Sequence, residues 1–287
     1  MLKENYHVAV PTAFRADESL DVDATCEHIL GLIKQGVKSV LVSGSTGEQH
    51  SMTVEEKIHL LHALDAQYFP ADVEILFGLA AIRQKDLLDL AVEIEQTKSV
   101  TAILLGFPPY IVPSQAEAIA YVERVLDVTK KPIVLYNNPR RTGFDLAVES
   151  INQLLEHPAI IGIKEAGNPD KVKDYQLPKD RLVRIYAGGE SGLAENVTLG
   201  FQSLSSIAGN LYPQEIKAWF EKLLAGKLQE MPFKEELAFL DEASPLPTLK
   251  RKISEKTAVN LGICRSPLGN EPNTPRMEEQ CESRKNY

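Results

Sequence analysis

The stretch Ile160-Ile161-Gly162-Ile163-Lys164-Glu165-Ala166 places a lysine at the end of an apolar run of β-branched residues. Such a run is typical of a buried parallel strand, and Lys164 stands where the strand gives way to a loop. A buried ammonium group is costly unless it is paired or neutral, so this lysine either extends to solvent or is retained for its chemistry. The stretch alone favours the first interpretation, and the other strands decide between the two.

Seven further short runs of this kind recur along the chain, at 6–11, 37–42, 73–77, 100–105, 132–136, 182–186 and 204–208. Between the runs lie segments with a helical spacing of apolar residues, at 20–35, 54–67, 87–96, 116–129, 148–155 and 193–199. Strict alternation of strand and helix predicts parallel pairing with right-handed crossovers. Eight strands within residues 1–210 match the smallest α/β proteins of the TIM-barrel type, so we predict a (β/α)8 barrel.

A doubly wound sheet is the competing architecture, and for nucleotide chemistry it would need a glycine-rich phosphate turn after its first strand. Val8-Ala9-Val10-Pro11-Thr12 offers no such turn. Residues 211–269 contain apolar-periodic segments that predict additional C-terminal helices on the flank of the barrel, at 214–224, 233–240 and 249–261. Residues 270–287 are polar and without a period, so we expect a flexible tail there.

Composition favours small-molecule chemistry. The 287 residues are 44% hydrophobic and 25% charged, with a net charge of −9 and scattered basic residues, which argues against nucleic acid or membrane partners. Cys26, Cys264 and Cys281 have no metal-ligand spacing and suit a reducing compartment. Residues 1–5 lack the apolar core of a signal peptide, and no run approaches the ~18 apolar residues of a membrane span. We therefore expect a cytoplasmic protein.

In a parallel barrel the functional residues lie at the C-terminal ends of the strands. The second strand is followed by Gly44-Ser45-Thr46-Gly47-Glu48. Its two hydroxyl groups and the loop amides can bind a carboxylate, although an ordinary glycine-rich turn explains the stretch equally well.

The fifth strand ends in Tyr136-Asn137-Asn138-Pro139-Arg140-Arg141-Thr142-Gly143. Tyr136 is either an aromatic core residue or, one strand away from Lys164, a group that shuttles protons. Arg141 is either a solvated charge or a bidentate clamp for a carboxylate.

Taken together, these residues resemble the family of dihydrodipicolinate synthase and N-acetylneuraminate lyase, which are pyruvate-dependent class I aldolases on a (β/α)8 barrel. The resemblance extends over residues 6–268. It rests on three motifs in the right order at the right strand ends: Gly44 to Glu48, Tyr136-Asn137 followed by Pro139, and Gly162-Ile163-Lys164-Glu165.

The resemblance implies a role for each site residue. Lys164 would form the Schiff base, Tyr136 would donate and accept protons, and Ser45 and Thr46 would bind the carboxylate of pyruvate. Ser45 would also link Tyr136 to a second tyrosine that reaches in from a neighbouring subunit, which matches Tyr110.

The same resemblance implies that Arg141 holds the carboxylate of the aldehyde substrate. It implies no metal and no cofactor, and it predicts a homo-oligomer, either a dimer or a tetramer.

Some positions depart from the family pattern. The loop Gly78-Leu79-Ala80-Ala81-Ile82-Arg83 differs from the usual turn, and Pro109 stands where the synthases carry another tyrosine. Ser45 in place of threonine is seen among the lyases, whereas Arg141 is typical of the synthases. Glu190, at the end of the seventh strand, would bind the hydroxyls of a sugar acid or would be a solvated glutamate at a helix start.

The sequence thus predicts a Schiff-base lyase that condenses pyruvate with a carboxylate-bearing aldehyde, as in 4-hydroxy-tetrahydrodipicolinate synthase. One alternative is an aldolase, lyase or dehydratase acting on 2-keto-3-deoxy sugar acids or on N-acetylneuraminate. Another is a catalytically silent barrel that senses a 2-oxo acid. The sequence leaves open the aldehyde, the direction of the reaction and the size of the oligomer.

Overall fold

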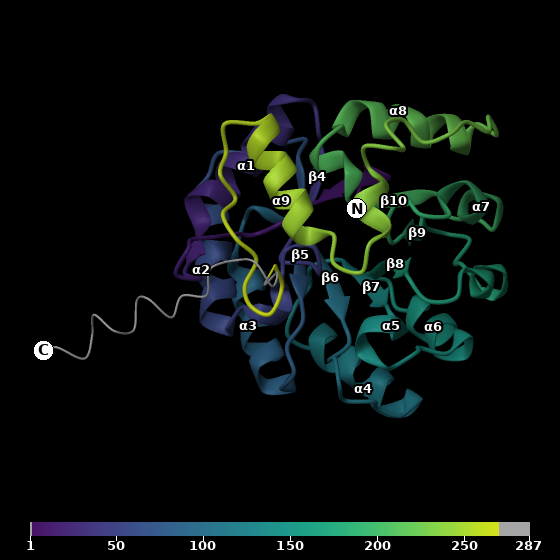
Figure 1. The fold of residues 1–287 in the computed structure, drawn as a ribbon. Coiled ribbons are helices and arrows are strands. Elements are labelled where there is room, and N and C mark those ends of the chain that lie inside the picture. The colour runs from purple at the N-terminus through teal and green to yellow at the C-terminus, as the bar shows by residue number, and fades with distance from the viewer. Residues whose placement is uncertain (1, 270–287) are drawn as a thin grey trace, which may run out of the picture.

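The computed structural model describes residues 2–269, in which eight parallel strands close into a barrel (Figure 1). In their order around the barrel the strands are β1 (Tyr6–Ala9), β10 (Ser203–Ser206), β9 (Arg184–Ala187), β8 (Ile160–Glu165), β7 (Ile133–Asn137), β6 (Val100–Gly106), β5 (Glu74–Leu79) and β4 (Ser39–Val42). The barrel closes because β1 pairs with both β10 and β4. The predicted (β/α)8 barrel is confirmed, and each predicted strand overlaps one observed strand.

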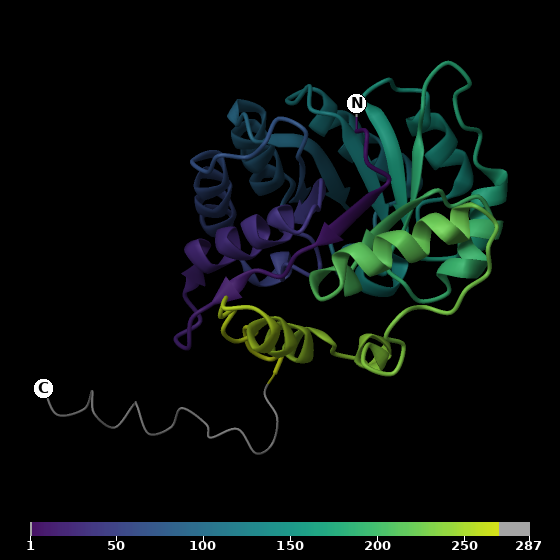
Figure 2. The same cartoon turned by 90° about the horizontal axis from the view of Figure 1, so that it is seen from above.

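Helices surround the strands, as Figures 1 and 2 show from two directions. They are α1 (Val22–Lys34), α2 (Val54–Asp65), α3 (Gln84–Gln96), α4 (Gln115–Leu126), α6 (Val148–Leu155), α7 (Leu193–Thr198) and α8 (Pro213–Leu224). Capping boxes fix where two of them begin: Thr53 and Glu56 at α2, and Ser114 and Glu117 at α4. Every helix within residues 2–269 is too short or too polar to traverse a bilayer.

The apolar core has two parts. The larger part lies between the strands and the helices. The smaller part fills the barrel and includes Leu41, Leu76, Leu104 and Val134. Because side chains alternate along a strand, these inward-facing residues come from every second position of β4 to β7. The ends of the same strands, where this packing stops, form the site described below.

Short elements fill the connections. β2 (Ala13–Phe14) and β3 (Leu20–Asp21) form an antiparallel pair before α1, which the sequence did not reveal because each strand has only two residues. Short helices in these connections include α5 (Pro139–Thr142), η1 (Gln49–Ser51), η2 (Pro169–Asp174) and η3 (Ala208–Asn210).

The C-terminal segment agrees only partly with its prediction. The expected helix 214–224 is confirmed by α8, and 249–261 corresponds to α9 (Leu246–Lys256). The expected helix 233–240 is wrong, since only η4 (Ala238–Asp241) forms there. Phe233 has a left-handed backbone, with φ of 56°, which does not fit a right-handed helix. Its ring stacks on Tyr212. The division at residue 210 stays an interpretation, and residues 270–287 lie outside the described residues.

A buried ion pair ties α9 to the loop after β4. Lys250 Nζ lies 2.5 Å from Glu48 Oε1, and these side chains are 1% and 0% exposed. Lys250 also donates to the Ile263 carbonyl, and Glu48 Oε2 accepts from the Arg265 backbone amide. The cationic groups of Lys250 and Arg265 lie 4.7 and 4.2 Å from the Phe14 ring centroid. The last loop and helix therefore hold the segment Gly44 to Glu48 in place.

Replacing one partner of this pair should destabilise the fold. Lys250→Met leaves the Glu48 carboxylate buried without its cation, so we expect the free energy of unfolding to fall by about 3–5 kcal/mol in urea denaturation. Lys222→Met, at an exposed position of α8, is the control and should change it by less than about 0.5 kcal/mol. The double variant Glu48→Gln, Lys250→Met should recover part of the loss. Equal stability of Lys250→Met and Lys222→Met would show that the pair does not hold the segment.

Candidate active site

A cavity of about 430 Å³ opens at the C-terminal ends of β4 to β7. This volume is within the range of small-molecule sites. Ser45 follows β4, Gly106 ends β6, and Tyr136 and Asn138 lie at the end of β7, and all four line the cavity. Gly78 in β5 lines it too, and a Cβ at this position would lie 2.0 Å from the Ser43 carbonyl oxygen, so only glycine fits.

Lys164 lies deeper than this cavity and is not one of its lining residues. It is 6% exposed, near the end of β8, where it pairs in register with Tyr136 of β7. Its Nζ donates to Ser205 Oγ at 2.9 Å and lies 4.8 Å from the centroid of the Tyr136 ring. Tyr136 thus contacts the Lys164 amine and also lines the cavity.

Burial lowers the pKa of the Lys164 amine, and the charge of Arg141 acts in the same direction, while Tyr136 and Glu190 oppose the shift. The neutral amine is therefore more populated at neutral pH than in an exposed lysine. A neutral amine is the nucleophilic form, so this environment favours attack on a carbonyl group.

The phenol of Tyr136 experiences opposing influences. Burial would raise its pKa, but the charge of Lys164 and hydrogen bonds with Ser45 and Asn138 outweigh burial, and the pKa lies below its ordinary value. Asn138 Nδ2 donates to the phenol oxygen at 2.6 Å. A phenol that gives up its proton more readily, beside a buried amine, can accept and return protons there.

The other predicted binding residues occupy different depths. Arg141 is exposed and lines the cavity from α5, together with Arg140. α5 begins at Pro139 and ends at Thr142, and the capping residue Gly143, with a φ of 77°, closes the turn. Thr46 is buried in the same loop as Ser45, but it does not line the cavity.

Like Lys164 and Thr46, the predicted residues Tyr110 and Glu190 do not line the cavity. Tyr110 is 95% exposed with a φ of 72°, whereas Pro109 beside it lines the cavity. Glu190 is 7% exposed, so its interpretation as a solvated glutamate is wrong. Its carboxylate accepts hydrogen bonds from Ser206 Oγ at 2.5 Å and from the Ile207 and Ala208 amides at 3.0 and 3.1 Å.

A buried network behind the site was not foreseen. Asn137 and Glu165 follow Tyr136 and Lys164 and are paired in register. Asn137 Nδ2 donates to Glu165 Oε2 at 2.9 Å, and the Tyr175 hydroxyl donates to the same oxygen at 2.7 Å. This network fixes the ends of β7 and β8 relative to each other. Its only signal in the sequence is a pair of polar residues directly after two candidate site residues.

Sequence reasoning also missed Ser205 and Asn138, which contact Lys164 and Tyr136. For Ser205 the signal was present, because Ser203-Leu204-Ser205-Ser206 puts hydroxyl groups into a strand that must be buried. Among residues 2–269 no three histidine, cysteine or acidic side chains gather in a way that could hold a metal ion.

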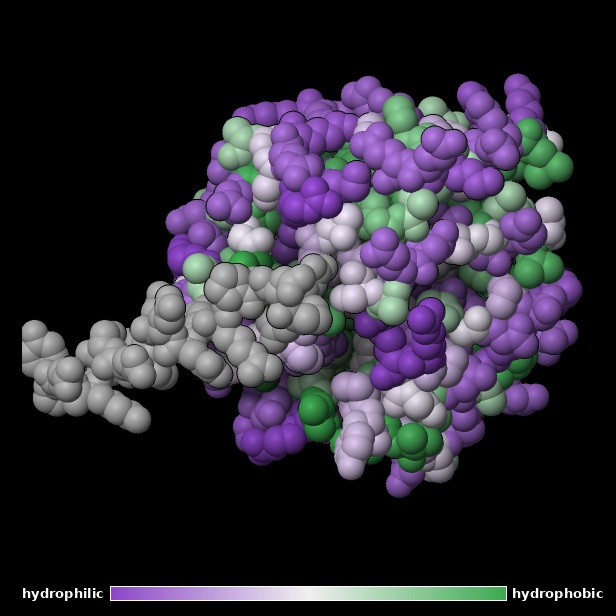
Figure 3. Space-filling view, viewed as in Figure 1, coloured by the Kyte–Doolittle hydropathy of each residue, from purple (hydrophilic) through white to green (hydrophobic). Residues whose placement is uncertain are grey.

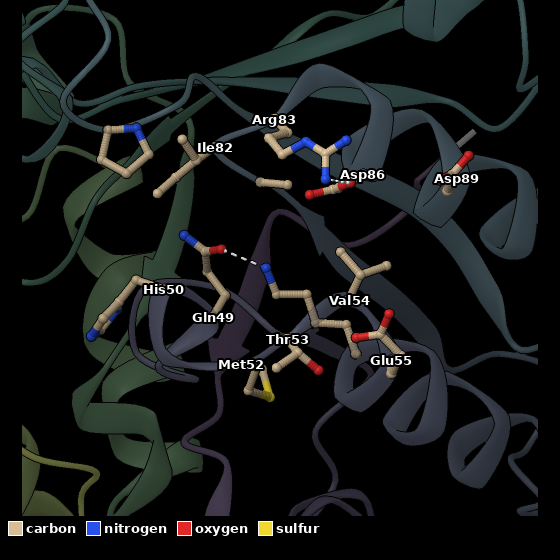
Figure 4. Close-up of a pocket in the computed structure, with 13 residues that line it drawn as sticks. Gln49, His50, Met52, Thr53, Val54, Glu55, Ile82, Arg83, Asp86 and Asp89 are labelled. Carbon is tan, nitrogen blue, oxygen red and sulfur yellow. Dashed lines mark hydrogen bonds and ion pairs between the residues drawn. The ribbon is translucent and has the colours of Figure 1, made fainter.

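A second cavity, of about 580 Å³, adjoins the first and shares Gln49, His50 and Pro109 with it. Figure 4 shows Gln49 on one side of this space and Arg83 and Asp86 on the other. None of the predicted site residues lines it. The surface seen in Figure 3 is mostly hydrophilic with small apolar patches, as the composition predicts.

Comparisons with known proteins show the family of the chain. A sequence model of the dihydrodipicolinate synthetase family matches residues 3–284. A 4-hydroxy-tetrahydrodipicolinate synthase of Stenotrophomonas maltophilia is 32% identical, over 85% of this chain and 85% of its own length.

Solved structures show the same fold at lower sequence identity. A dihydrodipicolinate synthase of Bacillus anthracis has a TM-score of 0.80 at 23% identity, covering 96% of this chain and 94% of its own. A sialic acid aldolase of Ruminococcus gnavus has a TM-score of 0.83 at 19% identity, covering 93% and 91%.

The environment of Tyr136 can be tested by ultraviolet titration of its phenolate. The difference between the wild type and Tyr136→Phe should show a phenol that ionises below the ordinary value of 10.0. In Lys164→Met the ionisation should move above that value, because burial remains and the cation is gone. Tyr121, whose pKa burial raises, is the control, so the Tyr121→Phe difference should show no step below pH 10.0. If the Lys164→Met substitution leaves the Tyr136 titration unchanged, the two groups are not coupled.

Proposed function

The chain belongs to the dihydrodipicolinate synthetase family, and on this premise we propose that it condenses pyruvate with a carboxylate-bearing aldehyde through a Schiff base on Lys164. The observation that carries the proposal is the buried Lys164 amine against the Tyr136 ring, below a cavity that Arg141 lines. Each of the three groups has a separate task in such a reaction.

Lys164 would supply the nucleophile. An amine attacks the ketone of pyruvate only when neutral, and for an ordinary lysine at pH 7 the neutral form costs about 4.6 kcal/mol. Burial of Lys164 reduces this cost. Attack on C2, followed by loss of water, gives an iminium ion.

Tyr136 would then move protons. The iminium ion withdraws electrons from the pyruvate methyl group, which loses a proton and becomes an enamine carbon nucleophile. The phenol has a lowered pKa and lies beside the amine, so it can take part in this transfer and in the earlier loss of water.

The two carboxylates would be held separately. Ser45, Thr46 and the amides of their loop would bind the carboxylate of pyruvate. Arg141, exposed on α5 and lining the cavity, would pair with the carboxylate of the aldehyde.

The second candidate is cleavage or dehydration of a 2-keto-3-deoxy sugar acid or of N-acetylneuraminate, in which Glu190 would bind substrate hydroxyls. Glu190 is buried, and its carboxylate accepts hydrogen bonds from Ser206, Ile207 and Ala208. This engagement favours the carboxylate-bearing aldehyde. A silent 2-oxo-acid sensor is disfavoured because it would not need the coupling of Lys164 to Tyr136.

We also propose a homo-oligomer, a dimer or a tetramer, in which Tyr110 reaches the site of a neighbouring subunit. Tyr110 is almost fully exposed with a left-handed backbone, and the adjacent Ile111 and Val112 are exposed apolar residues. A cytoplasmic location is part of the proposal, supported by the free thiols of Cys26 and Cys264.

A substrate panel tests the reaction. Pyruvate is incubated with aspartate semialdehyde and with neutral sugar aldehydes, and the consumption of pyruvate is followed. We expect turnover with the carboxylated aldehyde and none in Lys164→Ala, whose fold is checked by circular dichroism. Faster cleavage of a sugar acid by the wild type would favour the second candidate, and full activity of Lys164→Ala would exclude the Schiff base.

Arg141→Ala tests the selection of the aldehyde. Loss of the guanidinium should raise KM for the carboxylated aldehyde by about 30-fold or more, because a charge-assisted pair is lost. Binding of pyruvate should stay nearly unchanged, since Ser45 and Thr46 would hold that carboxylate. Arg140→Ala is the matched control in the same turn. A larger effect of Arg140→Ala would assign the role to Arg140.

A further inference from the structure

One sector of the barrel interior is polar. Near Lys164, β9, β10 and β1 contribute Tyr186, Ser203, Ser205 and His7 to the barrel interior, all buried, whereas the buried polar side chains of β4 and β5, Ser39 and Glu74, lie at the first positions of those strands. His7 pairs in register with Ser205, and Tyr186 with Lys164. The rings of His7 and Tyr186 are 5.0 Å apart. Buried polar groups destabilise a barrel core unless they make hydrogen bonds, so this sector calls for a functional explanation.

Ser205 is the member of this sector that contacts the reacting atom. Its side chain is fully buried, and its Oγ accepts a hydrogen bond from Lys164 Nζ at 2.9 Å. The hydroxyl therefore orients the amine: one N–H bond is directed toward β10, and the remaining positions on nitrogen are left for Tyr136 and the substrate.

We propose that Ser205 Oγ accepts the N–H of Lys164 both in the free amine and in the iminium ion, which makes Ser205 a further catalytic residue. This inference rests on the proposed function and deepens it. In the overall step, the ammonium form of Lys164 and the ketone give the iminium ion and water. Two of the three ammonium protons leave with the ketone oxygen, and one stays on nitrogen. That proton is the one that Ser205 accepts.

The charges around Lys164 fit this role. His7, on β1, has its pKa lowered to about 3 by burial and by the charge of Lys164, so the ring is neutral at pH 7 and adds no second cation. The other ionisable groups that act on Lys164 are Tyr136 of β7, Glu190 after β9 and Arg141 of α5. The hydrogen bond of Lys164 Nζ goes to the neutral Ser205 hydroxyl, which stabilises the iminium N–H without removing its charge.

The strand itself supplies matched controls. Ser203 is buried on the same face of β10, and its Oγ has no hydrogen-bond partner among residues 2–269. Ser206 is also buried, and its Oγ donates to Glu190. Replacing any of these three serines by alanine removes one Oγ atom from β10, and of the three hydroxyl groups only that of Ser205 contacts Lys164.

The experiment measures how much pyruvate is needed for half-maximal trapping of the Lys164 adduct by borohydride, detected by intact-protein mass. Ser205→Ala should need about 10-fold or more pyruvate than the wild type, as expected for a lost hydrogen bond to a charged group. Ser205→Thr keeps the hydroxyl, so the pyruvate concentration that it needs should lie within about 3-fold of the wild-type value. Ser203→Ala should match the wild type. If Ser205→Ala unfolds in a thermal melt, Ser205→Cys, a weaker acceptor of similar size, takes its place and should also need more pyruvate.

The outcomes separate the two claims. If the wild type forms no adduct, the proposed function itself fails. If the wild type is trapped and Ser205→Ala needs the same pyruvate concentration, Ser205 has no role at the nitrogen. An equal shift in Ser203→Ala would also overturn the inference, because the effect would then belong to the polar interior as a whole.

Discussion

A lysine amine buried among the inward-facing side chains of a parallel barrel is the feature on which the rest of this structure depends. Desolvation penalises the ammonium form of Lys164 and so favours the nucleophilic amine. The protein offsets the penalty with the Tyr136 ring on one side and the Ser205 hydroxyl on another. The same contacts that make the charge tolerable also orient the nitrogen, so stability and proposed reactivity are set by one arrangement.

Two buried polar networks hold that arrangement in place. Asn137 and Glu165 join the ends of β7 and β8, which keeps Tyr136 and Lys164 in register. Glu48 and Lys250 join the loop after β4 to α9, which fixes the loop that carries Ser45. Figure 2 shows α9 and the following loop along the edge of the barrel, beside the N-terminal strands. α9 does not line the cavity, but it contacts the candidate carboxylate-binding loop directly.

The barrel was predictable because each buried strand is a short apolar run and each crossover helix has its own apolar face. The candidate residues Lys164, Tyr136 and Ser45 were predictable because each lies at or just after a strand end. The contacts of Ser205 and Glu165 were not predictable, although the serines of β10 are a visible signal, since the contacts depend on which strands become neighbours and which side chains face inward. The helix expected at 233–240 failed for a local reason, the left-handed backbone of Phe233, which no apolar spacing reveals.

The central claim is that Lys164 is the amine that reacts with pyruvate. Borohydride reduction in the presence of pyruvate, followed by proteolysis and peptide mass mapping, locates that amine directly. Within residues 2–269 two other lysines are buried as deeply, Lys57 beside the second cavity and Lys250 paired with Glu48, so the comparison is internal. The account predicts a single reduced adduct on the peptide that contains Lys164, at a stoichiometry of one per chain. An adduct on Lys57 or Lys250, or none on Lys164, would contradict it.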